Sequence, residues 1–440
     1  MNSLTKTDVY AIVNAAVREM YGGESTLQAV DTSSFVSVGE HMLRTGRTET
    51  LQALNIVFGR TIIGVRPYKG KFQLIAKTPM QWGGIERKIS FYATKLEESE
   101  NFNTDINSGM LDDGQSIDHY KINKVYPLEM NFCGAKTEQK HYTTFRNQLK
   151  MAFTSEEEFS KFYSAMMIQI VNDIQMVYEA ENRLQVLNAI GATINVGRMR
   201  RQVVDLRIEY CLKYGLDPQD AANTLDNILT DPDKAKRLYE YMIERMQGDM
   251  ALMAENNELF HIYPARNDDS GNALTLLRHT PAEMRRLIMY EPYLRSAEAS
   301  ILPEIFHNNY LRVENYEGVE YWQNPNDPSG ISVEPNQLNV STGQSENGNA
   351  VDSSSPIYSY YVDDLNQAID IDSFRVIGLL FDRDALATSL LLEEVIATPV
   401  NAGGDYYNTY YHWLKNFKFD QTENMIVYVM SESSEVHTEG

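Results

Sequence analysis

The sequence has very little cysteine and no long apolar run. Its two cysteines, Cys133 and Cys211, lie far apart in a chain of 440 residues. Two thiols cannot form a disulfide framework or a four-ligand zinc site, so we expect a reducing compartment. The first residues lack an apolar signal core, and the apolar runs are far shorter than the ~20 residues of a membrane span. We therefore expect a protein that is neither secreted nor inserted in a membrane.

Positive charge is also scarce. The chain has 39 Lys and Arg against 61 Asp and Glu, which gives a formal net charge of -22. Tight binding to nucleic acid needs a basic surface that releases counterions, so any contact with DNA should be weak or confined to a local patch. The hydrophobic content of 43% and charged content of 23% are typical of a folded chain. A chain of this length should divide into two or three lobes.

The common catalytic and cofactor-binding motifs are missing. The sequence contains no GxGxxG, HExxH, CxxC or GxSxG, and its eight histidines are scattered singly. It therefore predicts no catalytic residue, no cofactor and no metal site, and we expect that the protein is not an enzyme. An enzyme with an unfamiliar site is the competing class, and the lack of any paired catalytic motif argues against it.

The strongest local pattern is a long amphipathic helix. Thr154 and Glu157 form a capping box, and apolar residues then recur at helical spacing until Gly191. The pattern predicts a helix over 155–190, roughly 36 residues and about 54 Å long. Since this is about three times the usual helix length, the helix must lie along another extended element.

Extended segments precede the long helix. Residues 1–55 are typical of two short helices on an arm, and period-two segments follow at 71–76 and 88–93. Residues 97–118 contain acidic residues and no Lys or Arg, so we expect a solvated tip. Strands this thin have no core of their own, and we expect four of their apolar side chains to contact another subunit. These four are Phe72, Leu74, Ile89 and Phe91.

The rest of the chain predicts a mixture of helices and strands. Asp217-Pro218 and Asp231-Pro232 each predict a helix start, since proline suits the first helical position. Residues 323–356 have the composition of a surface loop. The later predicted elements are strands at 286–290, 374–381, 392–398, 406–419 and 425–430, a helix near 293–299 and a short helix at 382–388.

One dense basic cluster follows the long helix, at Arg198, Arg200 and Arg201. It could contact DNA phosphates, or it could pair with the acidic surface of a neighbouring subunit. The sequence leaves both interpretations open.

Three stretches resemble the major capsid proteins of tailed phages, which have the Hong Kong 97 fold, and especially those of small short-tailed phages. The first is Pro127–Phe132 with the segment 149–153, the second is Met289-Tyr290 with 301–306, and the third is 375–384 with 393–398 and 406–411. The resemblance implies an α+β fold of the Hong Kong 97 type, with an N-arm, an extended β-loop, a peripheral domain with a long spine helix, and an axial domain.

The resemblance also implies a domain division. It places an N-terminal arm at 1–59, an extended loop and flanking strap at 60–153, and a peripheral domain with the spine helix at 154–269. An axial domain at 270–400 follows, and return strands of the peripheral domain and an acidic tail complete the chain at 401–440.

The function that the resemblance implies is structural. Copies of the chain would assemble into hexamers and pentamers of an icosahedral or prolate phage head around double-stranded DNA. The expected partners are other copies, a scaffolding protein, the portal and other head proteins, with weak nonspecific contact to the packaged DNA and none to a membrane. The expected location is the virion, after assembly in the host bacterial cytoplasm. The alternative is an encapsulin-type compartment, which has the same fold but encloses cargo enzymes.

Overall fold

The computed structural model describes residues 6–21, 28–31, 34–38, 41, 70–77, 86–94, 120, 122, 124–132, 135–145, 156–196, 201–300, 315–326, 328, 331–333, 344–345, 369–370 and 374–432. The chain divides into two compact units, each built from segments that are distant in sequence. Unit 1 comprises Met1–Gly84, Gly134–Gln185 and Thr388–Phe417, and unit 2 comprises Ile85–Cys133, Val186–Ala387 and Lys418–Gly440.

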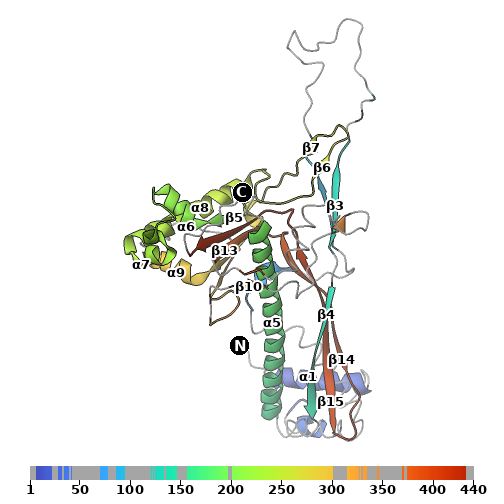
Figure 1. Ribbon diagram of the computed structural model, residues 1–440. Helices are drawn as coiled ribbons and strands as arrows, with labels where there is room; N and C mark the ends of the chain where they lie inside the picture. The colour runs from blue at the N-terminus through green and yellow to red at the C-terminus, as the bar shows by residue number, and fades with distance from the viewer. Residues whose placement is uncertain are drawn as a thin grey trace. The chain divides into compact units, whose positions relative to one another are not determined.

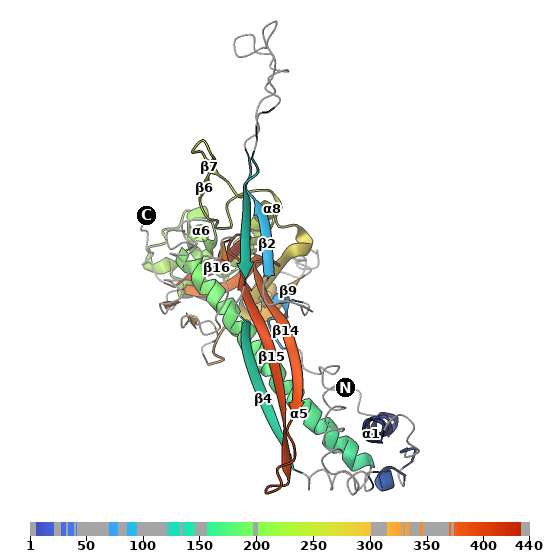
Figure 2. The ribbon, with the colours of Figure 1, turned by 90° about the vertical axis from the view of Figure 1, so that its right-hand side faces the viewer.

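Unit 1 is a four-stranded sheet with helices (Figure 1). Its elements are α1 (Lys6–Tyr21), the 3-10 turn η1 (Gln73–Ile75), β1 (Ala76–Lys77), β4 (Ala135–Phe145), the first part of α5 (Glu156–Val196), most of β14 (Leu386–Ala397) and most of β15 (Tyr406–Phe419). The strand order is β1-β14-β15-β4. β15 and β4 are antiparallel along their length, from the pair Tyr406 and Phe145 to the pair Asn416 and Ala135 (Figure 2).

The unit 1 part of α5 packs on one face of this sheet. Buried and half-buried residues alternate along the first part of β15, as expected for a strand with one covered face. On the covered face, the Trp413 ring of β15 meets the Tyr178 ring of α5 edge to face, with centroids 5.9 Å apart. The predicted long helix is thus confirmed, and the extended element that it lies along is this sheet.

The predicted end of the helix at Gly191 is wrong, because α5 continues to Val196. Residues 189–194 are all buried. A glycine inside a helix costs about 1 kcal/mol relative to alanine, and burial of Ile190 and Ile194 on either side of Gly191 outweighs that cost. Thr154, the expected cap, lies outside the described residues.

Unit 2 contains the main core of the described chain, a five-stranded sheet of order β5-β16-β13-β8-β9. These strands are β5 (Val203–Asp205), β8 (Arg285–Tyr290), β9 (Tyr316–Val319), β13 (Phe374–Asp382) and β16 (Met425–Ser431). Every residue of β16 is buried. Such a continuous buried run is typical of a strand covered on both faces. The strands expected at 286–290, 374–381 and 425–430 are confirmed.

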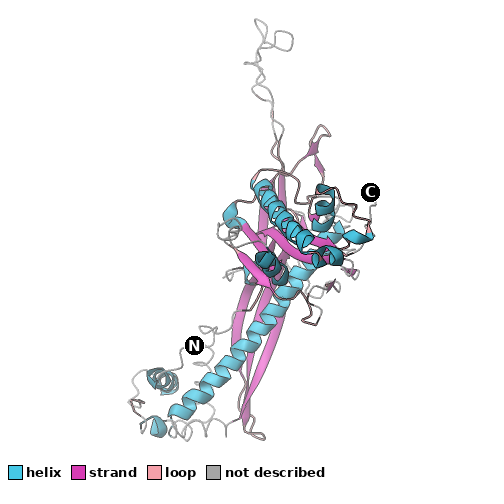
Figure 3. Cartoon of the chain, turned by 90° about the vertical axis from the view of Figure 1, so that its left-hand side faces the viewer, coloured by secondary structure: helices cyan, strands magenta, loops and turns pink. Residues whose placement is uncertain are grey.

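Helices of unit 2 gather around this sheet, in front of the strands in Figure 3. They are α6 (Leu206–Lys213), η3 (Ala221–Asn223), α7 (Leu225–Thr230), α8 (Pro232–Ala254), η4 (Ala282–Met284) and α9 (Glu291–Ser300). α8 begins as predicted, with Pro232 in its first turn and the Asp231 side chain accepting from the Asp233 and Lys234 amides. Among the described helices, none has the length and apolar character that crossing a membrane requires.

The helix predicted from Asp217-Pro218 is interrupted. The Asp220 side chain accepts a hydrogen bond from the Ala222 amide and begins η3 there, and α7 starts only at Leu225. Asp residues favour such local bonds to the backbone over a continuous helix.

The helix predicted at 382–388 is wrong. Asp382 accepts hydrogen bonds at its carbonyl from the Ala385 amide and at its side chain from the Asp384 amide. These bonds form a tight turn, after which the chain continues as β14 from Leu386.

The remaining strands of unit 2 are short or form a separate arm. They are β2 (Glu86–Phe91), β3 (Pro127–Phe132), β6 (Arg266–Asn267), β7 (Ala273–Leu274), β10 (Ser332–Val333), β11 (Gln344–Ser345) and β12 (Ile369–Asp370). β10 pairs with β12, and β11 pairs with β3. The range 323–356 therefore contains short paired strands, whereas its composition indicates only a surface loop. The α+β class itself is confirmed.

Candidate inter-subunit surface

Strands β2 and β3 of unit 2, with the described residues 120, 122 and 124–126, are called here the β2–β3 arm. The two strands are antiparallel, and their register runs from the pair Glu86 and Phe132 to the pair Phe91 and Pro127. Side chains of a strand alternate between its two faces. In β2, the residues at even positions are half-buried or buried and those at odd positions are exposed. The arm therefore has an inner face and an outer face.

The outer face presents apolar side chains to solvent. Ile89 is 52% exposed and Phe91 is 59% exposed. Beside them Arg87 pairs with Glu129 of β3, with Nη2 2.6 Å from Oε2. Further along the arm, Ile122 and Val125 are also exposed. Clustered exposed apolar residues with a charged rim are typical of a protein contact surface.

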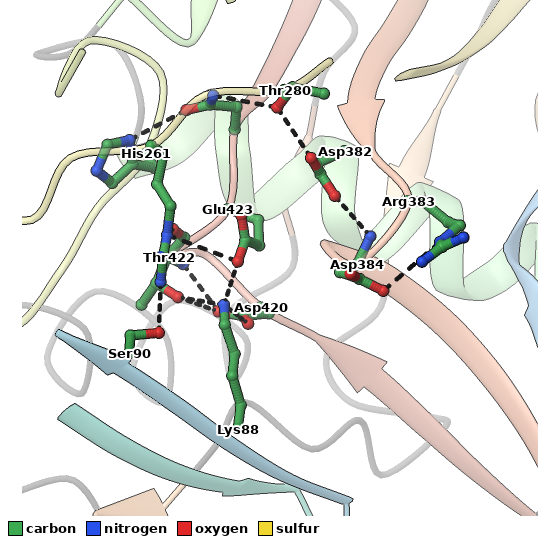
Figure 4. Close-up of polar contacts among 12 residues, drawn as sticks. Lys88, Ser90, His261, Thr280, Asp382, Arg383, Asp384, Asp420, Thr422 and Glu423 are labelled. Carbon is green, nitrogen blue, oxygen red and sulfur yellow. Dashed lines mark hydrogen bonds and ion pairs between the residues drawn. The ribbon is translucent and has the colours of Figure 1, made fainter. Parts of the chain in front are cut away.

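Ion pairs attach the inner face of the arm to the rest of unit 2. In Figure 4, Lys88 reaches from β2 toward Asp420 and Glu423, in the connection between β15 and β16. Its Nζ pairs with the Asp420 carboxylate, lies 2.5 Å from Oε1 of Glu423 and donates to the Thr422 hydroxyl at 2.9 Å. The side chain of Asp420 is fully buried. The arm is thus attached to the rest of unit 2 by a desolvated ion cluster.

Arg278 and Lys418 extend the cluster. Arg278 donates to the Ser90 hydroxyl at 2.7 Å and to the Thr422 carbonyl at 2.9 Å. Lys418 is buried, donates to Oε1 of Glu86 at 3.0 Å and lies over the Phe132 ring, 4.6 Å from its centroid. Each inward-facing polar residue of β2 therefore has a charged or hydroxyl partner in unit 2.

The charges in the cluster fix the state of Asp420. Burial alone would raise the pKa of this carboxyl, but the neighbouring ammonium groups of Lys88 and Lys418 hold the pKa down at about 2. Asp420 is therefore ionised at neutral pH. The pKa of Glu423 changes in the opposite direction, because burial raises it.

An apolar cluster completes the attachment. Tyr92, Leu274 and Leu276 are buried together, and Tyr126, Leu128 and Tyr263 pack against them. The Tyr92 hydroxyl donates to the Pro264 carbonyl at 2.7 Å, and burial raises the pKa of Tyr92 to about 12. The end of β2 that carries Phe91 is consequently held in place.

Three buried polar residues near this cluster, His261, Thr280 and Asp382, form hydrogen bonds. Nδ1 of the fully buried His261 lies 3.1 Å from Oδ1 of Asn424, and its Nε2 lies 2.9 Å from the Leu276 carbonyl. Thr280 donates to Asp382 at 2.9 Å (Figure 4). Both ring nitrogens thus lie within hydrogen-bond distance of a neutral oxygen. In the part of the chain that the structure describes, no three His, Cys, Asp or Glu residues converge as a metal site would require.

The structure places Phe72 differently from the expectation. It was expected on a subunit contact surface, but its side chain is fully buried in unit 1. Phe72 has a left-handed backbone with φ 61° and precedes the turn η1, so the expected period-two strand does not form there. The Arg183 guanidinium of α5 lies 4.9 Å from the Phe72 ring centroid. Phe72 therefore packs on α5 of the same subunit. Leu74, two residues later, is half-buried.

Three of the other residues expected at contacts, Ile89, Phe91 and Arg201, are exposed. Ile89 and Phe91 lie on one outward face of β2, and their role in subunit contact stays a prediction. Arg201 is exposed, whereas Arg198 and Arg200 lie outside the described residues. Both interpretations of the basic cluster stay open.

The ion cluster was not predicted from the sequence. Lys88 sits between the residues of the apolar alternation, and Asp420-Gln-Thr-Glu423 reads as a polar turn between two strands. The available signal was the period of two, which places Lys88 on the face opposite to Ile89. A lysine on the inner face needs a buried carboxylate as a partner.

Residues 13–429 match the family model of the Phi29-like phage major capsid protein. No curated protein matches the sequence significantly. Solved structures similar to the chain include the capsid of Staphylococcus phage Andhra, with 11% identity, TM-score 0.46 and coverage of 83% of this chain and 86% of that one. The capsid of the cyanophage P-SCSP1u has 10% identity, TM-score 0.40 and coverage of 82% and 87%.

Proposed function

The chain belongs to the family of Phi29-like phage major capsid proteins and forms part of a capsid, and from this premise we propose how its subunits assemble. The α+β fold agrees with the Hong Kong 97 type, and the role is structural. Copies of the chain associate into hexamers and pentamers of an icosahedral or prolate head that encloses double-stranded DNA. The encapsulin alternative receives no support from the family.

The observation that carries this proposal is the two-faced β2–β3 arm. Its inner face is attached to unit 2 through Lys88 and Asp420, whereas its outer face leaves Ile89 and Phe91 exposed. A rigidly held apolar face loses little conformational entropy when it binds, so it is suited to repeated contacts between identical subunits. We assign the outer face to a neighbouring subunit in the shell.

The partners follow from the same assignment. Besides other copies, we include a scaffolding protein, the portal and other head proteins, with assembly in the host bacterial cytoplasm before the protein reaches its place in the virion. The net charge of -22 suits a wall that holds packaged DNA loosely. Arg198, Arg200 and Arg201 supply either a local DNA contact or a contact with an acidic neighbour.

Electron microscopy of the purified full-length protein, with and without a scaffolding partner, tests the proposal. We expect closed shells built from hexamers and pentamers, and we expect shells recovered from infected cells to contain DNA. Light scattering at micromolar concentration that shows only particles near 50.3 kDa, with the scaffolding partner present, would overturn it. Shells that copurify with an enzyme and no DNA would favour the encapsulin alternative instead.

A further inference from the structure

One edge of the four-stranded sheet of unit 1 is covered only in part. β14 pairs with β15 on one side, and on its other side the short β1 pairs only with Thr388 and Ser389. Among the described residues, no strand pairs with 390–397 on that second side. Open strand edges bind other strands readily, so folded proteins usually cover or pair them. The segment 390–397 is called here the β14 edge.

The exposed side chains of the β14 edge are largely apolar. Exposed and half-buried residues alternate along it, which gives the exposed row Leu392, Glu394 and Ile396. Leu392 is 52% exposed and Ile396 is 47% exposed. The solvated face of an antiparallel sheet usually carries polar residues. The row therefore indicates a surface that another chain covers.

The charges on the β14 edge disfavour a second β14 as that chain. If the edges of two copies paired antiparallel over their full length, Glu393 of one copy would lie opposite Glu394 of the other. Like charges directly opposite each other destabilise a sheet. The strand that covers this edge should instead carry an exposed cation beside apolar residues.

β2 of a second copy has these features. It is the terminal strand of its sheet, in the order β11-β3-β2, so its outer edge is unpaired among the described strands. Its exposed row is Arg87, Ile89 and Phe91. The Arg87 side chain stays 60% exposed although it pairs with Glu129. Because a guanidinium has five N–H donors, Arg87 can bind a second carboxylate.

One antiparallel register matches the two exposed rows. With Arg87 opposite Glu394, Ile89 lies opposite Leu392, and the whole of β2 lies within the stretch that β1 leaves uncovered. A parallel pairing with the same ion pair would run past Ala397, the end of β14. Building on the subunit contact assigned above, we propose that β2 of one copy adds antiparallel to the β14 edge of a neighbouring copy. Backbone hydrogen bonds then join the two sheets, and the facing side chains set the register.

Disulfide crosslinking in assembled shells tests the pairing. Shells formed from a mixture of Ile89→Cys and Leu392→Cys subunits should give an inter-subunit disulfide on mild oxidation, because the pairing brings the two Cα atoms within the roughly 7 Å that a disulfide spans. Non-reducing electrophoresis detects the linked dimer. Wild-type shells, which keep Cys133 and Cys211, give the background. A mixture of Ile89→Cys and Leu212→Cys, at an exposed position on α6, is the matched control and should not exceed that background.

Charge reversal supplies a second measurement that needs no cysteine. Glu394→Arg would place two cations opposite each other at every copy of the pair, so the yield of shells should fall about tenfold or more. The thermal midpoint of the unassembled subunit should stay near that of the wild type, because Glu394 is exposed. Glu255→Arg, at an exposed position after α8, makes the same change of charge and should leave the shells intact.

The outcomes separate this inference from the proposed function. Shells of the Ile89→Cys and Leu392→Cys mixture without the disulfide, or a normal yield of shells from Glu394→Arg, would overturn the strand pairing and leave the arm in contact with another surface. A wild-type chain that forms no shells would overturn the proposed function and this inference with it.

Discussion

Replacement of Asp420 by alanine is expected to destabilise unit 2 by about 3–5 kcal/mol, the usual cost of removing one partner from a buried ion pair. Asp420 is fully buried against Lys88, and Lys418 contributes to its ionisation. Without the carboxylate, the Lys88 ammonium keeps Glu423 as its only acidic partner among the described residues. The free energy of unfolding, measured by urea titration of the unassembled subunit, checks the size of the loss.

The matched control is Asp269→Ala. Asp269 pairs with Lys124 on the same arm, but both of these side chains are more than half exposed. Exposed ion pairs contribute about 0–1 kcal/mol, so this variant should unfold almost like the wild type. Equal stabilities of Asp420→Ala and Asp269→Ala would show that the cluster is solvated and does not hold the arm.

Lowering the pH should destabilise the wild-type subunit in part as Asp420→Ala does, because it protonates Asp420. Because the pKa of Asp420 is lowered from 3.8 to about 2 on folding, its contribution to stability is present above pH 3.8 and is lost as the pH falls toward 2. The stability difference between wild type and Asp420→Asn should therefore shrink over this range. A difference that is constant with pH would mean that Asp420 has no lowered pKa.

Local periodicity predicted the long elements well, because many residues contribute to each signal. The helix α5 and the strands β15 and β16 follow from repeated apolar spacing. The errors occur where one contact outweighs the local preference. Gly191 continues the helix because its neighbours are buried, and the hydrogen bonds of Asp382 produce a turn in place of a short helix.

The candidate surface was predictable only in part, for a similar reason. Alternation along β2 correctly separates the exposed Ile89 and Phe91 from the inner face. The same rule fails at Phe72, where a left-handed backbone directs the ring onto α5. The pairing of Lys88 with Asp420 joins residues 332 positions apart in the chain, and nothing in the local pattern of either one identifies the other.

Replacement of Ile89 and Phe91 together by serine is expected to abolish shell formation and leave the subunit folded. Both side chains are more than half exposed, and substitutions at exposed sites usually change stability by less than about 0.5 kcal/mol. In a shell, the same two side chains would lose their apolar contact at every copy of the interface, and small losses per contact multiply over the assembly. Electron microscopy counts the shells, and the thermal midpoint of the unassembled subunit reports folding.

Phe72→Ala should give the opposite result. Its ring is fully buried against Arg183 within one subunit, so truncation should cost about 3–5 kcal/mol of stability.

Leu212→Ser, at an exposed position on α6, controls for a general loss of apolar surface and should leave both folding and shells intact. Normal shells from the Ile89 and Phe91 double variant would rule out the outer face of the arm as a subunit contact. Unfolding of that variant would instead place the two side chains in the core of the subunit, since exposed residues have no intramolecular packing to lose.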